Sequence, residues 1–206
     1  MVAYQFLELL KHFASKAAAN IDGLGEQWCR ILIEQQLVSD VADLYYLNNE
    51  QLLQLDRMGN KLATKIMDNI ESSKSRPLAR LIYALGILHV GTEVAELMTQ
   101  TYDNIELISQ ASEEDLTEIP GIGPKIAASI VTYFAVPANQ EVIVKLLRAG
   151  VVLQQESRPK AGVGNLLFSG LTFVVTGTLS SQSRNEAESH IKNLGGKVTS
   201  SVTRNT

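Results

Sequence analysis

Four short segments of the sequence carry glycine in a spacing that favours binding of an anion. Glycine permits positive φ and leaves no side chain in the way, so consecutive N–H groups can point at one spot. A helix that follows adds its unpaired first N–H groups and the positive end of its dipole. Together these groups suit phosphate, with no need for net positive charge on the chain. We call the segments hairpins 1 to 4: residues 21–25, 55–59, 87–91 and 119–123.

The hairpins share their second glycine but differ at the first glycine position. The second glycines are Gly25, Gly59, Gly91 and Gly123, which lie 34, 32 and 32 residues apart. At the first position, Gly23 and Gly121 stand in hairpins 1 and 4, but Arg57 and His89 in hairpins 2 and 3. Positive φ is uncommon for residues other than glycine, although His is enriched there. Hairpins 2 and 3 are therefore either structural turns or contact phosphate through these two side chains.

Two lysines follow the second glycine by two residues, near the start of an expected helix. They are Lys61 and Lys125, and phosphate contact and plain solvent exposure suit them equally. A lone Gly-x-Gly is usually only a turn, whereas four copies in one phase favour an array that contacts DNA. His89 fits a packed or turn histidine better than a catalyst. We predict no catalytic residue and no metal site in this chain.

The residues around the hairpins repeat as well. A small residue lies four positions after each second glycine and an apolar residue seven positions after it, on one face of a helix. A dinucleotide-binding glycine motif would need a preceding β-strand, and these flanks read as helices. Ser112, followed by three acids, predicts a helix N-cap. We expect a mainly α domain over residues 1–152, with helices at 3–17, 26–36, 60–72, 77–85, 92–101, 124–135 and 139–147.

Composition bounds the class of protein. The 206 residues are 45% hydrophobic and 19% charged, and 18 basic against 22 acidic side chains give a net charge of −4. This excludes a uniformly basic coat protein for nucleic acid but not a local basic face. The single cysteine excludes an internal disulfide, and no apolar run reaches the roughly 18 residues of a membrane span. We expect a cytoplasmic protein. Basic residues gather at Arg57, Lys61, Lys65, Lys74, Arg76 and Arg80, where a solvated helix surface is the simplest interpretation.

The last part of the chain has a different pattern. Residues 153–165 are expected to be a linker, rich in Gly, Ser and Pro. Strand-like runs at 171–176 and 197–203 flank a helical segment at 183–194. Strand, helix, strand predicts a small α/β unit with parallel pairing over residues 166–206.

These features resemble the helix–hairpin–helix motif of DNA-repair proteins. Residues 12–25 (HFASKAAANIDGLG), 84–91 (ALGILHVG) and 116–123 (LTEIPGIG) are similar to the C-terminal half of bacterial NAD+-dependent DNA ligases. The resemblance implies four tandem helix–hairpin–helix units in two paired modules that help to encircle nicked duplex DNA through its minor groove. It implies backbone contacts around the glycines of all four hairpins, with a hydroxyl contact from Thr92, and no bond chemistry.

The stretch from residue 166 onward resembles the opening of a BRCT domain, about half of that module. The resemblance implies a phosphate contact at Thr176, Gly177 and Thr178, assisted by Arg184; a purely structural turn and helix cap is the competing interpretation. The adenylated Lys-x-Asp-Gly motif and the other ligase domains are absent, so we expect a fragment that does not ligate by itself. NAD+, Mg²⁺ and Zn²⁺ are implied only for the full-length enzyme, whose remaining domains would be partners. We expect a monomer associated with the bacterial nucleoid.

Two other function classes compete with this interpretation. A helix–hairpin–helix DNA glycosylase would place a catalytic Asp about 18 residues after Lys125, but Ile143 stands there and Glu141 is out of register. A helical-repeat and BRCT scaffold would recruit proteins instead of DNA. Binding to nicked duplex separates the ligase interpretation from the scaffold.

Overall fold

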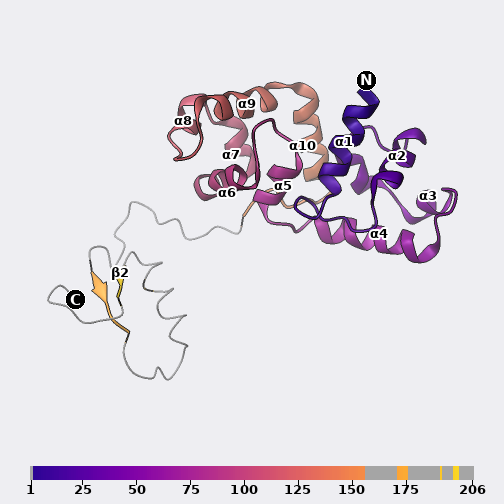
Figure 1. Cartoon of the computed structure of the whole chain (residues 1–206), viewed down its shortest axis with the longest axis horizontal. Helices are drawn as coiled ribbons and strands as arrows, with labels where there is room; N and C mark the ends of the chain where they lie inside the picture. The colour runs from indigo at the N-terminus through magenta and orange to yellow at the C-terminus, as the bar shows by residue number, and fades with distance from the viewer. Residues whose placement is uncertain (1, 156–170, 176–190, 192–196, 200–206) are drawn as a thin grey trace. The chain divides into compact units, whose positions relative to one another are not determined.

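The structure is a computed structural model that describes residues 2–155, 171–175, 191 and 197–199. The chain divides into two compact units, Met1–Glu156 and Ser157–Thr206 (Figure 1).

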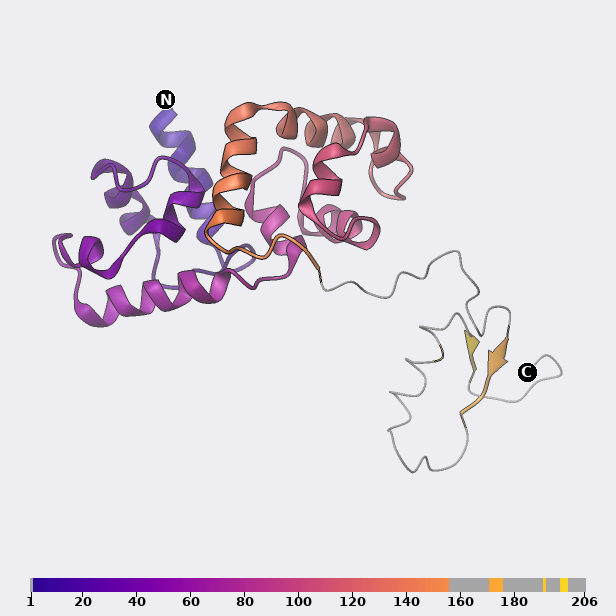
Figure 2. The same cartoon turned by 180° about the vertical axis from the view of Figure 1, so that it is seen from behind.

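The regular elements of unit 1 within its described residues are helices, apart from one isolated β-bridge. The helices α1–α4 form one group and α5–α10 form a second group beside it, and the two are joined where α1 meets α5 and where α10 meets η1 (Figures 1 and 2). The helices are α1 (Val2–Ala14), α2 (Glu26–Glu34), the 3₁₀ helix η1 (Val41–Tyr46), α3 (Asn49–Leu53), α4 (Asn60–Ser73), α5 (Leu78–Ala84), α6 (Thr92–Thr101), α7 (Ile105–Gln110), α8 (Glu113–Thr117), α9 (Pro124–Ala135) and α10 (Pro137–Arg148).

The repeating positions form the centre of the core. The eight side chains at the fourth and seventh positions after the second glycines are fully buried, which confirms the predicted helical face, and so are the four that lie five positions before the first glycine position. Small residues at the fourth position after each second glycine let the two helices of a pair approach closely. The pairs α1–α2, α3–α4, α5–α6 and α8–α9 each pack together around one hairpin. The twelve residues are Ala18, Cys29, Leu32, Leu52, Ala63, Ile66, Ala84, Ala95, Met98, Leu116, Ala127 and Ile130.

Side-chain caps start the short helices. Ser112 caps α8 as predicted, since it accepts a hydrogen bond from the Asp115 N–H, and the Asp115 side chain completes a capping box. Asp40 begins η1 and Asn48 begins α3 with the same reciprocal arrangement, and Asn104 caps α7. These caps fix elements too short to show helical periodicity.

Residues 151–155 fold back onto unit 1. Val151 and Leu153 are buried, the Val152 N–H donates to the Lys74 carbonyl at 2.8 Å, and Asn104 forms a β-bridge with Gln154. Residues 153–155 thus still contact the helices, because Leu153 is buried in the core and the Gln155 N–H donates to the Asp103 carbonyl at 2.8 Å.

Unit 2 contains two short parallel strands among its described residues. β1 (Thr172–Phe173) pairs with β2 (Lys197–Val198), and the Thr199 N–H donates to the Phe173 carbonyl at 2.9 Å. The parallel pairing confirms that part of the sequence prediction. The predicted linker beyond residue 155, most of the predicted helix, and Thr176, Gly177, Thr178 and Arg184 lie outside the described residues.

No single helix within the described residues is long and apolar enough to cross a membrane. Taken together, the consecutive helices α9 and α10 are long and apolar enough, but the chain bends by 74° between them.

Candidate nucleic-acid interface

All four hairpins form the same tight turn. In each hairpin the N–H of the fourth residue donates to the carbonyl of the first. The N···O distance is 3.3 Å in hairpin 1, 3.1 Å in hairpin 2 and 3.0 Å in hairpins 3 and 4. The third residue of each turn has positive φ: 94° at Gly23, 65° at Arg57, 66° at His89 and 98° at Gly121. Arg57 and His89 thus adopt the conformation that glycine adopts elsewhere, so replacing glycine has not changed the turn.

The second glycines cap the four long helices that follow the hairpins. Gly25, Gly59, Gly91 and Gly123 are the N-caps of α2, α4, α6 and α9, with extended backbone and no side-chain cap hydrogen bond. Their φ values, from −77° to −89°, are open to any residue. A Cβ added at any of these four would meet nothing within 4 Å. Neither conformation nor packing inside the chain requires glycine at these positions.

The first glycines of hairpins 1 and 4 serve a different purpose. A Cβ on Gly23 would lie 3.2 Å from Ile66 Cγ1 and 3.3 Å from Leu62 Cδ1, both on α4. A Cβ on Gly121 would lie only 2.8 Å from Leu97 Cδ1 on α6. Hairpin 1 therefore packs on α4, the helix that follows hairpin 2. Hairpin 4 packs on α6, the helix that follows hairpin 3. The first glycine is an internal packing residue.

The tips of the hairpins face outward while their flanks are anchored. Asp22, Asp56, Leu88 and Pro120 occupy the tips and are exposed. The apolar residues immediately before each tip and directly before each second glycine are buried in the core. The turns are therefore held firmly, with their outer edge and the start of the next helix accessible to a ligand.

Three of the predicted contact side chains are accessible beside the hairpins. Lys61, Lys125 and Thr92 are exposed in the first turns of α4, α9 and α6. Lys61 borders an open groove of about 560 Å³ along α4 that also includes Lys65 and Asn69. Arg57, whose side chain is 86% exposed, lies 3.6 Å from the carboxylate of its neighbour Asp56.

The remaining residues of the basic segment have partners inside the chain. The Nε atoms of Arg76 and Arg80 donate to the carbonyls of Ala19 and Ala18, at 3.3 and 3.0 Å. These carbonyls lie in the turn between α1 and hairpin 1. Lys74 pairs with Glu71 at 2.7 Å. Much of the basic segment is thus structural, which charge counting along the sequence cannot reveal.

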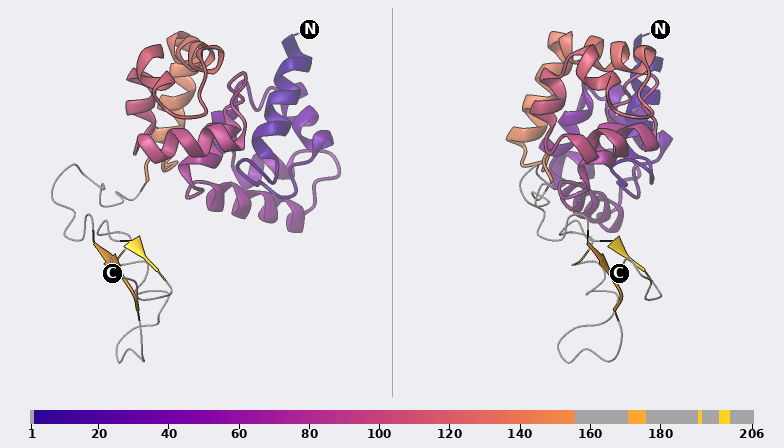
Figure 3. Two further views of the ribbon diagram at one scale, coloured as in Figure 1. Left: turned by 60° about the vertical axis from the view of Figure 1, so that its left-hand side comes forward. Right: turned by 90° about the vertical axis from the view of Figure 1, so that its left-hand side faces the viewer.

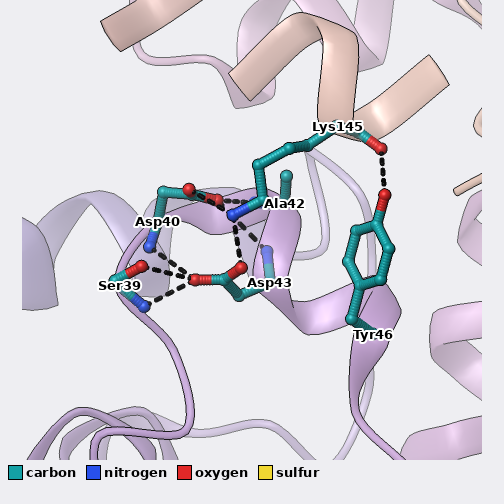
Figure 4. A network of polar contacts seen from close by, with 6 residues as sticks. All are labelled: Ser39, Asp40, Ala42, Asp43, Tyr46 and Lys145. Atoms are coloured by element: carbon teal, nitrogen blue, oxygen red, sulfur yellow. Dashed lines mark hydrogen bonds and ion pairs between the residues drawn. The ribbon is translucent and has the colours of Figure 1, made fainter. Parts of the chain in front are cut away.

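A polar network joins α10 to η1 (Figure 4). Lys145 Nζ donates to Asp40 Oδ2 at 2.6 Å and also to Asp43, while the Tyr46 hydroxyl donates to the Lys145 carbonyl at 2.9 Å. Burial raises the pKa of Asp43, but hydrogen bonds from Lys145, Ser39 and the Asp40 N–H outweigh burial and lower it to about 2. Sequence reasoning missed this network. The Asp40-x-x-Asp43 spacing of a capping box was the available signal.

No group of three or more His, Cys, Asp or Glu side chains within the described residues could hold a metal ion. Cys29 is buried, and burial raises the pKa of its thiol to about 11. Ile143, at the position where a glycosylase would carry its acid, is packed in the core.

Comparison with known proteins identifies two regions. A helix–hairpin–helix motif family matches residues 80–143, which include hairpins 3 and 4, and the BRCA1 C Terminus (BRCT) domain family matches residues 164–206. DNA ligase of Halothermothrix orenii is 48% identical over 199 residues, 97% of this chain and 30% of that protein. DNA ligase of Dehalococcoides mccartyi strain CBDB1 is 48% identical over 202 residues, 98% and 30%. DNA ligase of Brevibacillus brevis is 47% identical over 197 residues, 95% and 29%.

The chain spans about 30% of the length of the curated relatives it matches. Both matched families agree with the order of elements along the chain, helical hairpins first and the parallel strand pair second. Over nearly its whole length, this chain corresponds to the C-terminal helix–hairpin–helix plus BRCT region of bacterial DNA ligases.

Proposed function

We propose that this chain is the non-catalytic DNA-binding region of an NAD+-dependent DNA ligase. It grips nicked duplex DNA without regard to sequence, through main-chain N–H groups that contact phosphates. The four helix pairs and their turns are its helix–hairpin–helix units, arranged as two paired modules, hairpins 1 and 2 in one and hairpins 3 and 4 in the other (Figure 3).

The observation that carries this proposal is the open space at the second glycines. Internal packing and φ leave room for any residue at Gly25, Gly59, Gly91 and Gly123, yet all four are glycine. An external group that approaches the backbone closely explains the repeated absence of a side chain. The first amides of the next helix lie at that spot, with the positive end of the helix dipole behind them.

Main-chain donors explain how a chain of net charge −4 can bind a polyanion. Exposed cations add to them at two hairpins, through Arg57 and Lys61 at hairpin 2 and Lys125 at hairpin 4. Thr92 adds a hydroxyl at hairpin 3, where His89 lies at the turn. Each phosphate neutralised by a cation releases counterions, so binding weakens steeply with salt.

The wider setting belongs to the same proposal. The ligation reaction, with its NAD+, Mg²⁺ and Zn²⁺, is assigned to the parts of the ligases that this chain does not match. We propose a monomer in the bacterial cytoplasm, associated with the nucleoid and with the remaining ligase domains. Thr176, Gly177 and Arg184 are proposed as a phosphate contact of the BRCT segment.

The test places a carboxylate at the second glycines. Gly91→Asp and Gly123→Asp should preserve or strengthen the helix caps, because Asp is a preferred N-cap residue. They should weaken binding to a labelled nicked duplex at about 50 mM salt by roughly tenfold each, because the new carboxylate occupies and repels the phosphate position. Gly121→Asp is unsuitable, since its Cβ would clash with Leu97.

Asn104→Asp is the matched control. It introduces the same charge at the N-cap of α7, which follows no hairpin, and should leave affinity unchanged. If the glycine variants, shown to be folded by circular dichroism, bound nicked duplex as tightly as the parent chain, the proposal would be overturned.

A further inference from the structure

Hairpin 1 carries more acidic side chains than a phosphate site should. Asp22 occupies its tip and Glu26 is the first residue of α2, so the two carboxylates flank Gly23 and Gly25. Hairpin 4, by contrast, has no acid between residues 119 and 126. Like charges within a few ångströms repel even in water, so bare carboxylates here would oppose an approaching phosphate.

Both carboxylates are held by lysines from other elements. Lys65 Nζ on α4 lies 2.5 Å from Asp22 Oδ2. Lys11 Nζ on α1 lies 2.9 Å from Glu26 Oε2, and Arg30 pairs with the other Glu26 oxygen at 3.2 Å. The hydrogen bond from Lys65 lowers the pKa of Asp22, and the bond from Lys11 lowers the pKa of Glu26, so both acids stay ionised and paired.

The pairing at Asp22 is part of a larger attachment of hairpin 1 to α4. One turn beyond Lys65, the side-chain amide of Asn69 donates to the Asp22 carbonyl at 3.1 Å. Gly23 packs against Leu62 and Ile66 of the same helix. Lys65 therefore meets a carboxylate that two other contacts already hold in place, which reduces the entropy lost in forming the ion pair.

Resting on the proposed function, we infer that Lys65 and Lys11 are positioning residues that neutralise the acids of hairpin 1 so that its main-chain N–H groups can donate to a phosphate. They act through Asp22 and Glu26 and do not themselves bind DNA. A lysine that contacted phosphate directly would have to leave its carboxylate first.

A double-mutant cycle on the whole chain tests this inference. Binding to a labelled nicked duplex is followed by fluorescence anisotropy at about 50 mM salt for the parent, Lys65→Met, Asp22→Asn and the double variant. Lys65→Met should weaken binding about three- to tenfold, because it leaves Asp22 unpaired beside the phosphate. Asp22→Asn should bind at least as tightly as the parent. The double variant should regain the affinity of Asp22→Asn within about twofold, and the defect of Lys65→Met should shrink as salt rises.

Lys74→Met is the matched control. It removes a lysine that pairs with Glu71 at the far end of α4 from hairpin 2, and should change affinity less than twofold. A double variant as weak as Lys65→Met would show that Lys65 binds phosphate itself and would overturn the inference. A folded parent chain that does not bind nicked duplex would instead overturn the proposed function, and this inference with it.

Discussion

Lys145 Nζ lies 2.6 Å from Asp40 Oδ2, and the two residues are 105 positions apart in the sequence. The contact ties the last helix of unit 1 to a 3₁₀ helix near its start. Because both side chains are three-quarters buried, the pair is screened less than a surface ion pair. It fixes one group of helices against the other, and with them the two pairs of hairpins.

Removing this contact should destabilise unit 1. We expect Lys145→Met to lower the free energy of unfolding by about 1–3 kcal/mol, because two part-buried carboxylates lose their cation. Urea unfolding followed by circular dichroism measures the change. Lys125→Met, at an exposed position, should alter it by less than about 0.5 kcal/mol. Equal midpoints for the two variants would show that the network does not stabilise the fold.

The same network predicts sensitivity to acid. The pKa of Asp43 is about 2 in the folded chain against an ordinary 3.8, so its stabilising contribution is complete well above pH 3.8. That contribution is lost as pH falls from about 4 toward 2. It amounts to roughly 1–2 kcal/mol. The difference in unfolding free energy between pH 6 and pH 2.5 should be smaller in Asp43→Asn than in the parent chain, and an unchanged difference would contradict the assignment.

The two glycines of hairpin 4 should respond differently to alanine. Gly121→Ala should lower the free energy of unfolding by about 1–3 kcal/mol, since φ is +98° and the new methyl meets Leu97. Gly123→Ala should lower it by less than about 1 kcal/mol, because its φ and surroundings accept a side chain and only the N-cap preference for glycine over alanine is lost. Thermal unfolding of both variants decides the matter. Comparable losses would mean that both glycines are packing residues.

Replacing Arg57 with glycine should stabilise the fold and weaken binding to nicked duplex. Arg57→Gly should raise the free energy of unfolding by roughly 0.5–1 kcal/mol, because the left-handed conformation no longer strains a side chain. It should also weaken binding to nicked duplex and reduce the dependence of log affinity on log salt by about one.

Gln36→Gly is the control for Arg57. Gln36 is exposed, has φ of 56° and carries no charge, so this variant should gain similar stability with unchanged affinity. Loss of affinity in both variants would trace the effect to the backbone instead of the guanidinium.

The repeat allowed much of the fold to be predicted. The bounds 92–101 and 124–135 match α6 and α9, because a glycine cap and a strong apolar face define each of these helices. The elements η1, α3 and α7 were missed. They have six residues or fewer and depend on the caps Asp40, Asn48 and Asn104 instead of periodicity.

The candidate site was less accessible to sequence reasoning. The sequence indicated both glycines of hairpin 4 alike, but only the structure separates Gly121, which packs on Leu97, from Gly123, which faces open space. Charge alone could not show that Arg76 and Arg80 donate to carbonyls of the α1–α2 connection, because that pairing joins residues about 60 positions apart. The DNA contacts of all these residues remain predictions.

One helix supports two of the turns at once. The first residue of α4 follows Gly59 of hairpin 2, and the first three turns of this helix carry Leu62, Ile66 and Asn69, which hold hairpin 1. Because hairpin 2 leads into the N-terminus of α4 and hairpin 1 packs along the same helix, a tilt of α4 would move both hairpins. The position of α4 therefore sets the distance between hairpins 1 and 2.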